Sequence, residues 1–189
     1  MTLTPELDLR FREAAAAAGL VDVAYDVTDS PIGDLLVAAT ERGLCNISFD
    51  PDDAADRLAR AFGRRVLRVP SRLDTIRRQL DEYFEGRREA FELEPDISLL
   101  PPFQQLVLYE LAQVPYGRLT TYGALARRIG RPRAARAVGG ALNRNPIPIV
   151  LPCHRVVGAS GSLTGYAGGL HVKQRLLELE HALLTPPDS

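Results

Sequence analysis

Cys153 is the residue of this chain whose surroundings most favour covalent chemistry. It lies in Leu151-Pro152-Cys153-His154-Arg155, at the end of an apolar run and directly before a histidine and an arginine. A cysteine attacks as its thiolate, and a neighbouring imidazole or guanidinium favours the ionised form. We therefore expect a reactive thiol at this position.

A purely structural role for the same cysteine is the alternative. Free cysteine is among the most buried residue types, so Cys153 could be a small core residue beside an apolar strand. The proline before it and the charged pair after it argue against this, because a core strand seldom ends in such residues. The other cysteine, Cys45, lies in the apolar stretch 44–47 and is interpreted as a core residue.

The composition predicts a globular protein. Of its 189 residues, 46% are hydrophobic and 25% are charged, which is typical of folded soluble domains. No apolar run approaches the roughly 18 residues of a membrane helix, and no secretory leader is recognisable. We expect a cytoplasmic protein with no membrane partner and with reduced cysteines. Two cysteines and three histidines without metal-ligand spacing also predict that it binds no metal.

Charge is divided unevenly along the chain. Residues 1–98 contain 13 arginines and 20 acidic residues, whereas residues 99–189 contain nine arginines and one lysine against four acidic residues. Between Arg118 and Arg155, both included, there are eight arginines and no aspartate or glutamate. This favours a surface that faces phosphates. A solvated face in an arginine-rich proteome is the alternative.

The first half predicts a short extension followed by a small α/β unit. Residues 1–20, with an alanine run before Gly19, are typical of a helical or partly disordered extension. Hydrophobic periodicity then predicts three strands and two amphipathic helices, over residues 21–27, 35–40, 44–49, 51–62 and 71–85. The three prolines within residues 95–102 place a domain boundary near residue 98.

The second half predicts a helix-turn-helix. After a helix over residues 103–114, two short helices are expected over residues 120–129 and 133–142, joined by Gly130-Arg131-Pro132. Pro132 is expected near the start of the second helix, where its missing N–H is tolerated. Five arginines in this region could contact phosphates, at positions 127, 128, 131, 133 and 136. A plain helical hairpin is the alternative.

The segment around Cys153 also resembles a known active site. Asn145-Pro146-Ile147-Pro148, followed by Pro152-Cys153-His154-Arg155-Val156, resembles the acceptor-cysteine signature of the O6-alkylguanine-DNA alkyltransferases, which repair DNA by direct reversal. The resemblance extends over residues 20–184. It implies an N-terminal ribonuclease-H-like α/β domain over residues 21–98 and a mostly helical, winged helix-turn-helix domain over residues 99–189.

The resemblance implies a specific activity. Such a protein is a methylated-DNA-protein-cysteine S-methyltransferase that flips the damaged base out of the duplex. It transfers the alkyl group irreversibly from O6 of guanine, or O4 of thymine, to Cys153. The thioether product has no carbonyl for water to attack, so each molecule acts once. No cofactor is expected, because the damaged DNA is the alkyl donor.

Four catalytic roles follow from the resemblance. Cys153 would accept the alkyl group, and His154 would remove its proton through a bound water. Glu180 would orient His154, and Asn145 would brace the active-site turn. Glu178 is the rival carboxylate, and only the family spacing from the cysteine favours Glu180.

The resemblance also assigns contacts with DNA. Tyr122 would help to rotate the nucleotide out of the stack and would lie against the base, next to Thr121. Arg136 would fill the hole that the extruded base leaves. Ala135 and Gly139, on the same helix, would let that helix approach the minor groove closely.

The loop Gly165-Tyr166-Ala167-Gly168-Gly169 would close the base pocket. Tyr166 would line the guanine site, and the backbone N–H of Ala167 would face O6. Some relatives have serine in place of Ala167, so this chain lacks a hydroxyl there. The backbone carbonyl of Val156 would read the exocyclic amine of guanine.

The expected partner is double-stranded DNA that contains O6-alkylguanine. We expect a monomer, and cooperative binding to DNA stays open. Three other functions are alternatives. A non-catalytic module that binds alkylated DNA would have replaced the acceptor cysteine, so Cys153 argues against it. A Cys-His hydrolase would need an oxyanion hole that the sequence does not identify. A helix-turn-helix regulator is compatible with the basic stretch alone.

Overall fold

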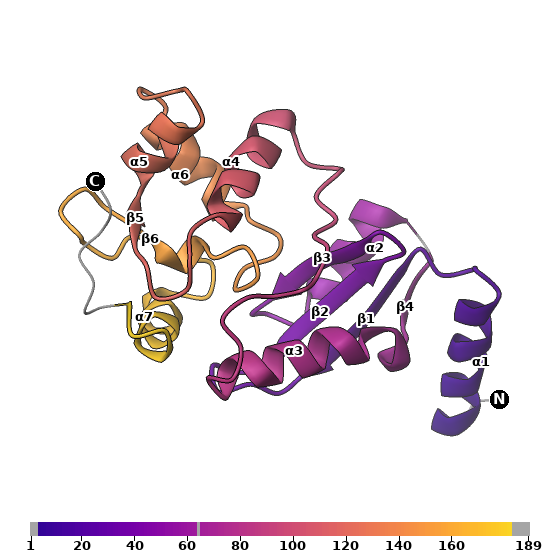
Figure 1. The fold of residues 1–189 in the computed structure, drawn as a ribbon. Helices are drawn as coiled ribbons and strands as arrows, with labels where there is room; N and C mark the ends of the chain where they lie inside the picture. The colour runs from indigo at the N-terminus through magenta and orange to yellow at the C-terminus, as the bar shows by residue number, and fades with distance from the viewer. Residues whose placement is uncertain (1–3, 64, 183–189) are drawn as a thin grey trace. The chain divides into compact units, whose positions relative to one another are not determined.

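The chain divides into two units (Figure 1). A computed structural model describes residues 4–63 and 65–182. The first unit comprises Met1–Glu82 and Glu92–Asp96, and the second comprises Tyr83–Phe91 and Ile97–Ser189. Parts of the expected extension (1–3) and of the expected second domain (183–189) lie outside the described residues. The domain limits at residues 20 and 98 stay predictions.

A four-stranded sheet forms the centre of the first unit, in the order β3-β2-β1-β4. β1 (Val23–Thr28), β2 (Leu35–Thr40) and β3 (Gly43–Ser48) are antiparallel neighbours, and all three were predicted as strands. β4 (Val66–Arg68) pairs with β1 in parallel. It was not predicted, because three residues in an arginine-rich stretch are too few to show a period.

Helices cover both faces of this sheet (Figure 1). Leu58 of α2 (Ala54–Phe62) packs in one cluster with Val23 of β1 and with Leu36 and Ala38 of β2. The buried Asp26 of β1 points to the other face, because neighbouring residues of a strand alternate.

Two helices lie on the Asp26 side. Arg77 of α3 (Asp74–Phe84) forms an ion pair with Asp26. Ala15 and Ala16 of α1 (Pro5–Ala17) pack with Ala24 of β1. A 3₁₀ helix, η1 (Pro70–Leu73), precedes α3.

Helices dominate the second unit, so the predicted combination of an α/β unit and a mostly helical unit is confirmed. They are α4 (Pro102–Ala112), α5 (Tyr122–Arg128), α6 (Ala135–Asn143) and α7 (Leu170–Leu179). Two short strands, β5 (Thr120–Thr121) and β6 (Val156–Val157), pair in parallel, with Thr120 opposite Val156. This pairing places the start of α5 beside the segment that follows Cys153. Within the described residues no helix has both the length and the hydropathy to cross a membrane.

α5 and α6 are joined by a turn, as predicted, but the second helix begins later than expected. Gly130 has a φ of 71°, and the N–H of Arg131 donates to the carbonyl of Ala126 at 2.8 Å, a bond that closes the end of α5. The chain then needs residues 131–134 to reverse direction. Pro132 lies in this turn, as predicted, and α6 starts at Ala135, two residues later than expected.

Candidate active site

Cys153 lies at the end of a tight loop between α6 and β6. Pro152 has φ −82° and ψ 64°, and the N–H of Cys153 donates to the carbonyl of Leu151 at 2.8 Å, which is the geometry of an inverse γ-turn. Ile149, in the same loop, has a φ of 76° although its side chain is β-branched and fully buried. That conformation is costly and persists only where its surroundings hold it. The thiol therefore lies on a constrained backbone.

Asn145 braces this loop through both ends of its amide. Its Nδ2 donates to the carbonyl of Leu151 at 2.8 Å and to Sγ of Cys153 at 3.3 Å. Its Oδ1 accepts from the N–H of Ile147 at 3.1 Å. Asn145 thus links the beginning of the loop to the sulfur, and its donation to sulfur favours the thiolate.

The resting Cys153 is a protonated thiol. Burial raises its pKa from 9.0 to about 11, although the hydrogen bond from Asn145 and the charge of Lys173 act in the opposite direction. The expectation that Arg155 favours ionisation of the neighbouring thiol is wrong. Its guanidinium is occupied by Glu180 and by the carbonyl of Val114, the latter at 2.6 Å. Removal of the thiol proton from Cys153 therefore requires a base.

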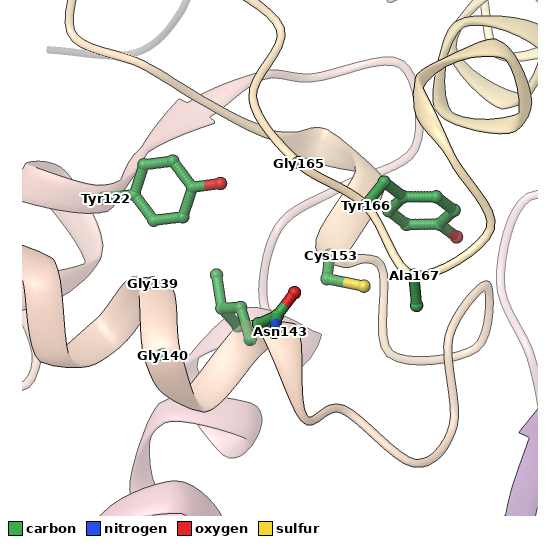
Figure 2. Close-up of a pocket in the computed structure, with 9 residues that line it drawn as sticks. Tyr122, Gly139, Gly140, Asn143, Cys153, Gly165, Tyr166 and Ala167 are labelled. Atoms are coloured by element: carbon green, nitrogen blue, oxygen red, sulfur yellow. The ribbon is translucent and has the colours of Figure 1, made fainter.

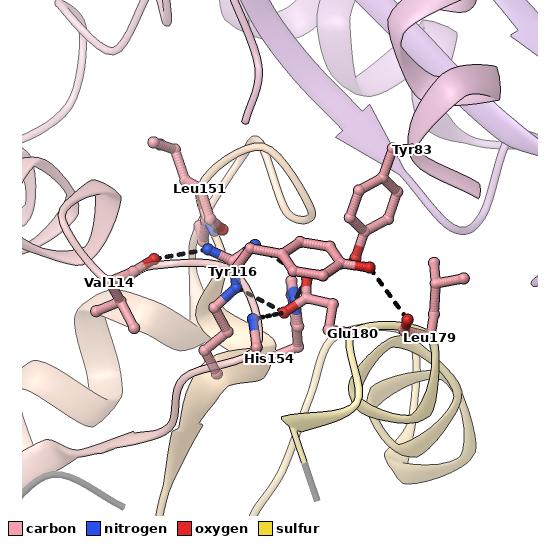
Figure 3. Close-up of polar contacts among 10 residues, drawn as sticks. Tyr83, Val114, Tyr116, Leu151, His154, Leu179 and Glu180 are labelled. Carbon is pink, nitrogen blue, oxygen red and sulfur yellow. Dashed lines mark hydrogen bonds and ion pairs between the residues drawn. The ribbon is translucent and has the colours of Figure 1, made fainter. Parts of the chain in front are cut away.

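Glu180 is the centre of a buried polar cluster (Figure 3). Its Oε1 accepts from the hydroxyl of Tyr83 at 2.7 Å, from Nε2 of His154 at 2.8 Å and from Nη2 of Arg155 at 2.9 Å. Its Oε2 accepts from Nε of Arg155 at 2.8 Å and from the N–H of Gly117 at 3.3 Å. Burial alone would raise the pKa of this carboxyl, but the bonds and charges of His154 and Arg155 outweigh it and hold the pKa well below its ordinary value.

These contacts determine the state of His154. Burial is the main cause that lowers the pKa of its imidazole below the ordinary 6.5, so the ring is neutral near neutral pH. An ionised Glu180 can only accept, so Nε2 must carry the ring proton and Nδ1 must hold a lone pair. Within the described part of the chain, the buried Nδ1 has no hydrogen-bond partner. His154 is therefore a neutral base with its accepting nitrogen available.

The structure separates the two rival carboxylates. Glu180 caps the end of α7 and is only 2% exposed. Glu178 is exposed, accepts from Nε2 of Gln174 at 2.9 Å and lies 3.9 Å from Arg175. Of these two carboxylates, it is Glu180 that contacts His154.

A cavity of about 320 Å³ opens at the sulfur (Figure 2). It brings together six of the residues predicted from the resemblance, which are Tyr122, Gly139, Cys153, Gly165, Tyr166 and Ala167. Figure 2 shows the ring of Tyr122 on one side of the site and Tyr166 and Ala167 on the other, with the sulfur of Cys153 directed toward the side of Tyr166 and Ala167. The arrangement suits a flat group held between aromatic rings with one atom next to sulfur.

Four other predicted contacts do not line this cavity in the described part of the chain. Arg136 is exposed near the start of α6, next to the half-buried Ala135. Thr121 caps α5, since its Oγ1 accepts from the N–H of Ala124 at 3.1 Å. Val156 is buried, and its carbonyl accepts from Nζ of Lys173 at 2.6 Å.

Several functional residues were not predicted. Gly140, Leu142 and Asn143 line the cavity from α6, and no sequence signal distinguishes them from other helix residues. Lys173 is fully buried and donates to the carbonyls of Val156 and Thr164. A signal existed here, because Lys173 is the only lysine in a chain that otherwise uses arginine.

The loop that carries Tyr166 is held at its beginning. The hydroxyls of Tyr122 and Thr164 are 2.7 Å apart, and Lys173 donates to the carbonyl of Thr164 at 3.3 Å. Because Lys173 also binds the residue after the 3₁₀ helix η2 (Cys153–Arg155), it connects the loop to the cysteine segment.

Comparison with known proteins places both units in one family. Residues 23–97 match the model of the 6-O-methylguanine DNA methyltransferase ribonuclease-like domain, and residues 102–182 match that of its DNA binding domain. A methylated-DNA--protein-cysteine methyltransferase of Methanosarcina barkeri is 43% identical over 168 residues, which is 82% of this chain and 96% of the relative. One from Mycobacterium leprae is 44% identical over 164 residues, 83% of this chain and 92% of the relative.

Solved structures agree with these matches. The crystal structure of Mycobacterium tuberculosis OGT in complex with DNA has a TM-score of 0.75 at 40% identity, covering 86% of this chain and 95% of that one. The Mycobacterium tuberculosis O6-methylguanine methyltransferase has a TM-score of 0.73 at 41% identity, covering 88% and 96%.

Replacing Glu180 with glutamine should lower the free energy of unfolding by about 3–5 kcal/mol, because the buried Arg155 would lose its counter-charge. The control is the exposed Glu178 on the last turn of α7. Glu178→Gln should change the free energy of unfolding by less than about 0.5 kcal/mol. Urea denaturation near neutral pH measures the free energy of unfolding of both variants. Equal losses of stability would contradict the assignment of Glu180 as the buried partner of Arg155.

The difference between wild type and Glu180→Gln should also depend on pH. Because the folded pKa of Glu180 lies below its ordinary value of 4.5, the contribution of the charge is fully present above that value. It is lost as the pH falls through the depressed folded value. The difference in unfolding free energy should thus be constant above about pH 5 and shrink below about pH 4. A difference that widens on acidification would argue against an ionised Glu180.

Proposed function

The chain belongs to the 6-O-methylguanine DNA methyltransferase family, and we propose that it repairs DNA by moving the O6-alkyl group of guanine onto its own Cys153. The observation that carries the proposal is a buried thiol that opens onto a pocket between two tyrosines and adjoins a neutral histidine base. We extend the proposal to O4 of thymine, which presents an alkylated oxygen in the same way. The partner is double-stranded DNA that contains the alkylated base, on which a single protein molecule acts.

The alkylated base must leave the helix before the reaction. O6 of guanine lies inside the base stack, where a protein sulfur cannot reach it, so the nucleotide has to be flipped into the pocket. There Tyr122 and Tyr166 would hold the base, and the N–H of Ala167 would face O6. Flipping costs a few kcal/mol and is easiest for a mispaired, damaged base, which contributes to selectivity.

The chemistry follows from the states of Cys153 and His154. Nδ1 of His154 accepts the thiol proton, through a bridging water, and the imidazolium that forms is stabilised by the ionised Glu180. The thiolate attacks the alkyl carbon, so that the S–C bond forms while the C–O6 bond breaks and its electron pair moves onto guanine. The imidazolium then returns the proton, which ends on the restored guanine.

Nothing in this site regenerates the cysteine. The product is a thioether, and without a carbonyl it offers water no point of attack. Each molecule therefore repairs one lesion, and the alkylated DNA supplies the group without a cofactor.

The DNA would be bound by the arginine-rich helix pair. Arg136 is exposed at the start of α6, the helix from which Gly139 and Gly140 line the pocket. A side chain at that position could enter the stack where the flipped base leaves a hole. The small residues Ala135 and Gly139 would allow the helix to lie close to the groove.

Incubation with duplex DNA that contains O6-methylguanine should add about 14 Da, one CH₂, to Cys153. Peptide mass spectrometry locates the adduct, which should reach one per molecule and then stop. Cys45, buried in the sheet of the first unit, provides the control. Cys45→Ala should keep the adduct and Cys153→Ala should lose it. Repeated turnover without an adduct at Cys153 would refute the proposal.

Arg136→Ala should slow transfer from duplex DNA by about tenfold or more, because the flipped state loses the side chain that fills the stack. Transfer from free O6-alkylguanine base should be unchanged, since no hole is created. Arg175, exposed on α7, controls for the loss of one positive charge. Single-turnover rates on both substrates decide the matter, and equal slowing on duplex and free base would exclude the assigned role.

A further inference from the structure

Tyr83 makes a contact with the catalytic cluster that the proposed mechanism does not use. Its hydroxyl donates to Oε1 of Glu180 at 2.7 Å, the same oxygen that accepts from Nε2 of His154 (Figure 3). The side chain is fully buried. Among the described residues, the other donors to Oε1 are His154 and Arg155, which directly follow Cys153 in the chain. Tyr83 comes from a distant part of the sequence.

The surrounding aromatic rings fix this hydroxyl. The ring of Tyr83 lies 5.4 Å from that of Phe84, 5.3 Å from that of Phe91 and 6.2 Å from that of Tyr116, measured between centroids. Burial, followed by the charge of Glu180, raises the pKa of Tyr83 well above 10.0. The hydroxyl therefore stays protonated and can donate a hydrogen bond to Glu180.

A purely structural tyrosine would need only a hydrogen-bond acceptor for its hydroxyl. Tyr116, in the same aromatic group, is such a case, because its hydroxyl donates to the carbonyl of Leu179 at 3.1 Å. Tyr83 instead donates to the carboxylate that holds the base. A carboxylate oxygen that already accepts other bonds attracts a further proton less strongly.

We infer that Tyr83 is a positioning residue for the alkyl transfer, which holds Oε1 of Glu180 in place and limits how strongly that oxygen draws on His154. The inference rests on the proposed function. By sharing the charge of Glu180, Tyr83 keeps the histidine neutral and able to accept the thiol proton. Without the hydroxyl, Oε1 would carry more uncompensated charge, and the imidazolium form would be favoured.

Other charges near His154 do not change when this hydroxyl is removed. The titratable and charged groups around the imidazole and its carboxylate partner are Tyr83, Tyr116, Cys153, Arg155, Tyr166, Lys173 and Glu180. Tyr116 and Tyr166 have raised pKa values and stay neutral below pH 8. The response to Tyr83→Phe therefore reports on the bond to Glu180.

Loss of the hydroxyl should raise the pKa of His154, because the carboxylate then stabilises the imidazolium more. The reaction needs the neutral imidazole, so the acidic limb of the pH profile should move to higher pH. The expected shift is about half to one pH unit, as one hydrogen bond would give.

The experiment compares wild type, Tyr83→Phe and Tyr116→Phe in single-turnover transfer to Cys153 between about pH 5 and 8. At the acidic end Tyr83→Phe should be about three- to tenfold slower than wild type, and at the alkaline end within about twofold of it. Tyr116→Phe removes a hydroxyl from the same aromatic group without touching Glu180, and its acidic limb should coincide with that of wild type.

A slowing of Tyr83→Phe by the same factor at every pH, or an unshifted limb, would overturn the inference. The pKa of His154, measured by NMR without DNA, is an independent readout. This measurement separates the role of Tyr83 from the proposed alkyl transfer. If the wild-type protein formed no adduct at Cys153, the proposed function would be refuted, but the NMR titration of His154 would still test the effect of Tyr83. If Tyr83→Phe does not fold, 3-fluorotyrosine at this position keeps the ring and strengthens the donor. It should then lower the pKa of His154, and an unchanged or higher value would overturn the inference.

Discussion

The buried carboxylate of Glu180 is the constraint on which the rest of the active site depends. An ion removed from water is tolerated only where charges and hydrogen bonds replace its hydration. Glu180 obtains them from four residues, Tyr83, Gly117, His154 and Arg155. Gly117 has a φ of 69° and a Cβ on it would lie 2.9 Å from the carbonyl of Glu180, so this turn admits no larger residue without a shift. The contacts that stabilise the charge of Glu180 thus fix the positions of His154, of Arg155 and of the turn at Gly117.

This arrangement assigns different tasks to neighbouring residues. Arg155 neutralises Glu180, and burial keeps His154 a neutral base. Cys153 receives no direct charge from either and stays protonated at rest. A protonated, buried thiol reacts poorly with oxidants, since the thiolate is the reactive form. The site therefore combines a protected nucleophile with a base that is ready to activate it.

Local signals in the sequence predicted most helices and strands. They did not predict the features that depend on contacts between distant residues. Gly130 marked the end of α5, and apolar runs bounded by turn residues predicted the first three strands. β4 depends on a partner strand, so its own three residues carried too little signal. The start of α6 was predicted at residue 133, two residues too early, because the chain uses residues 131–134 to reverse direction after α5.

The same distinction applies to the site. The resemblance around Cys153 led to His154, Asn145 and Glu180, which the structure brings together. Arg155 was assigned to the wrong neighbour, because adjacency in sequence says nothing about where a guanidinium points. Tyr83 was missed altogether, since it lies 97 positions from Glu180 in the chain. Long-range polar pairs of this kind leave no periodicity or spacing to read.

The central claim, that His154 is a neutral base whose Nε2 proton is held by an ionised Glu180, is tested most directly by the tautomer of that imidazole. Nitrogen-15 NMR of the histidine ring near neutral pH distinguishes a protonated nitrogen from one that carries a lone pair. The account predicts a proton on Nε2 and an unprotonated Nδ1. A proton on Nδ1, or an imidazolium with both nitrogens protonated, would contradict it.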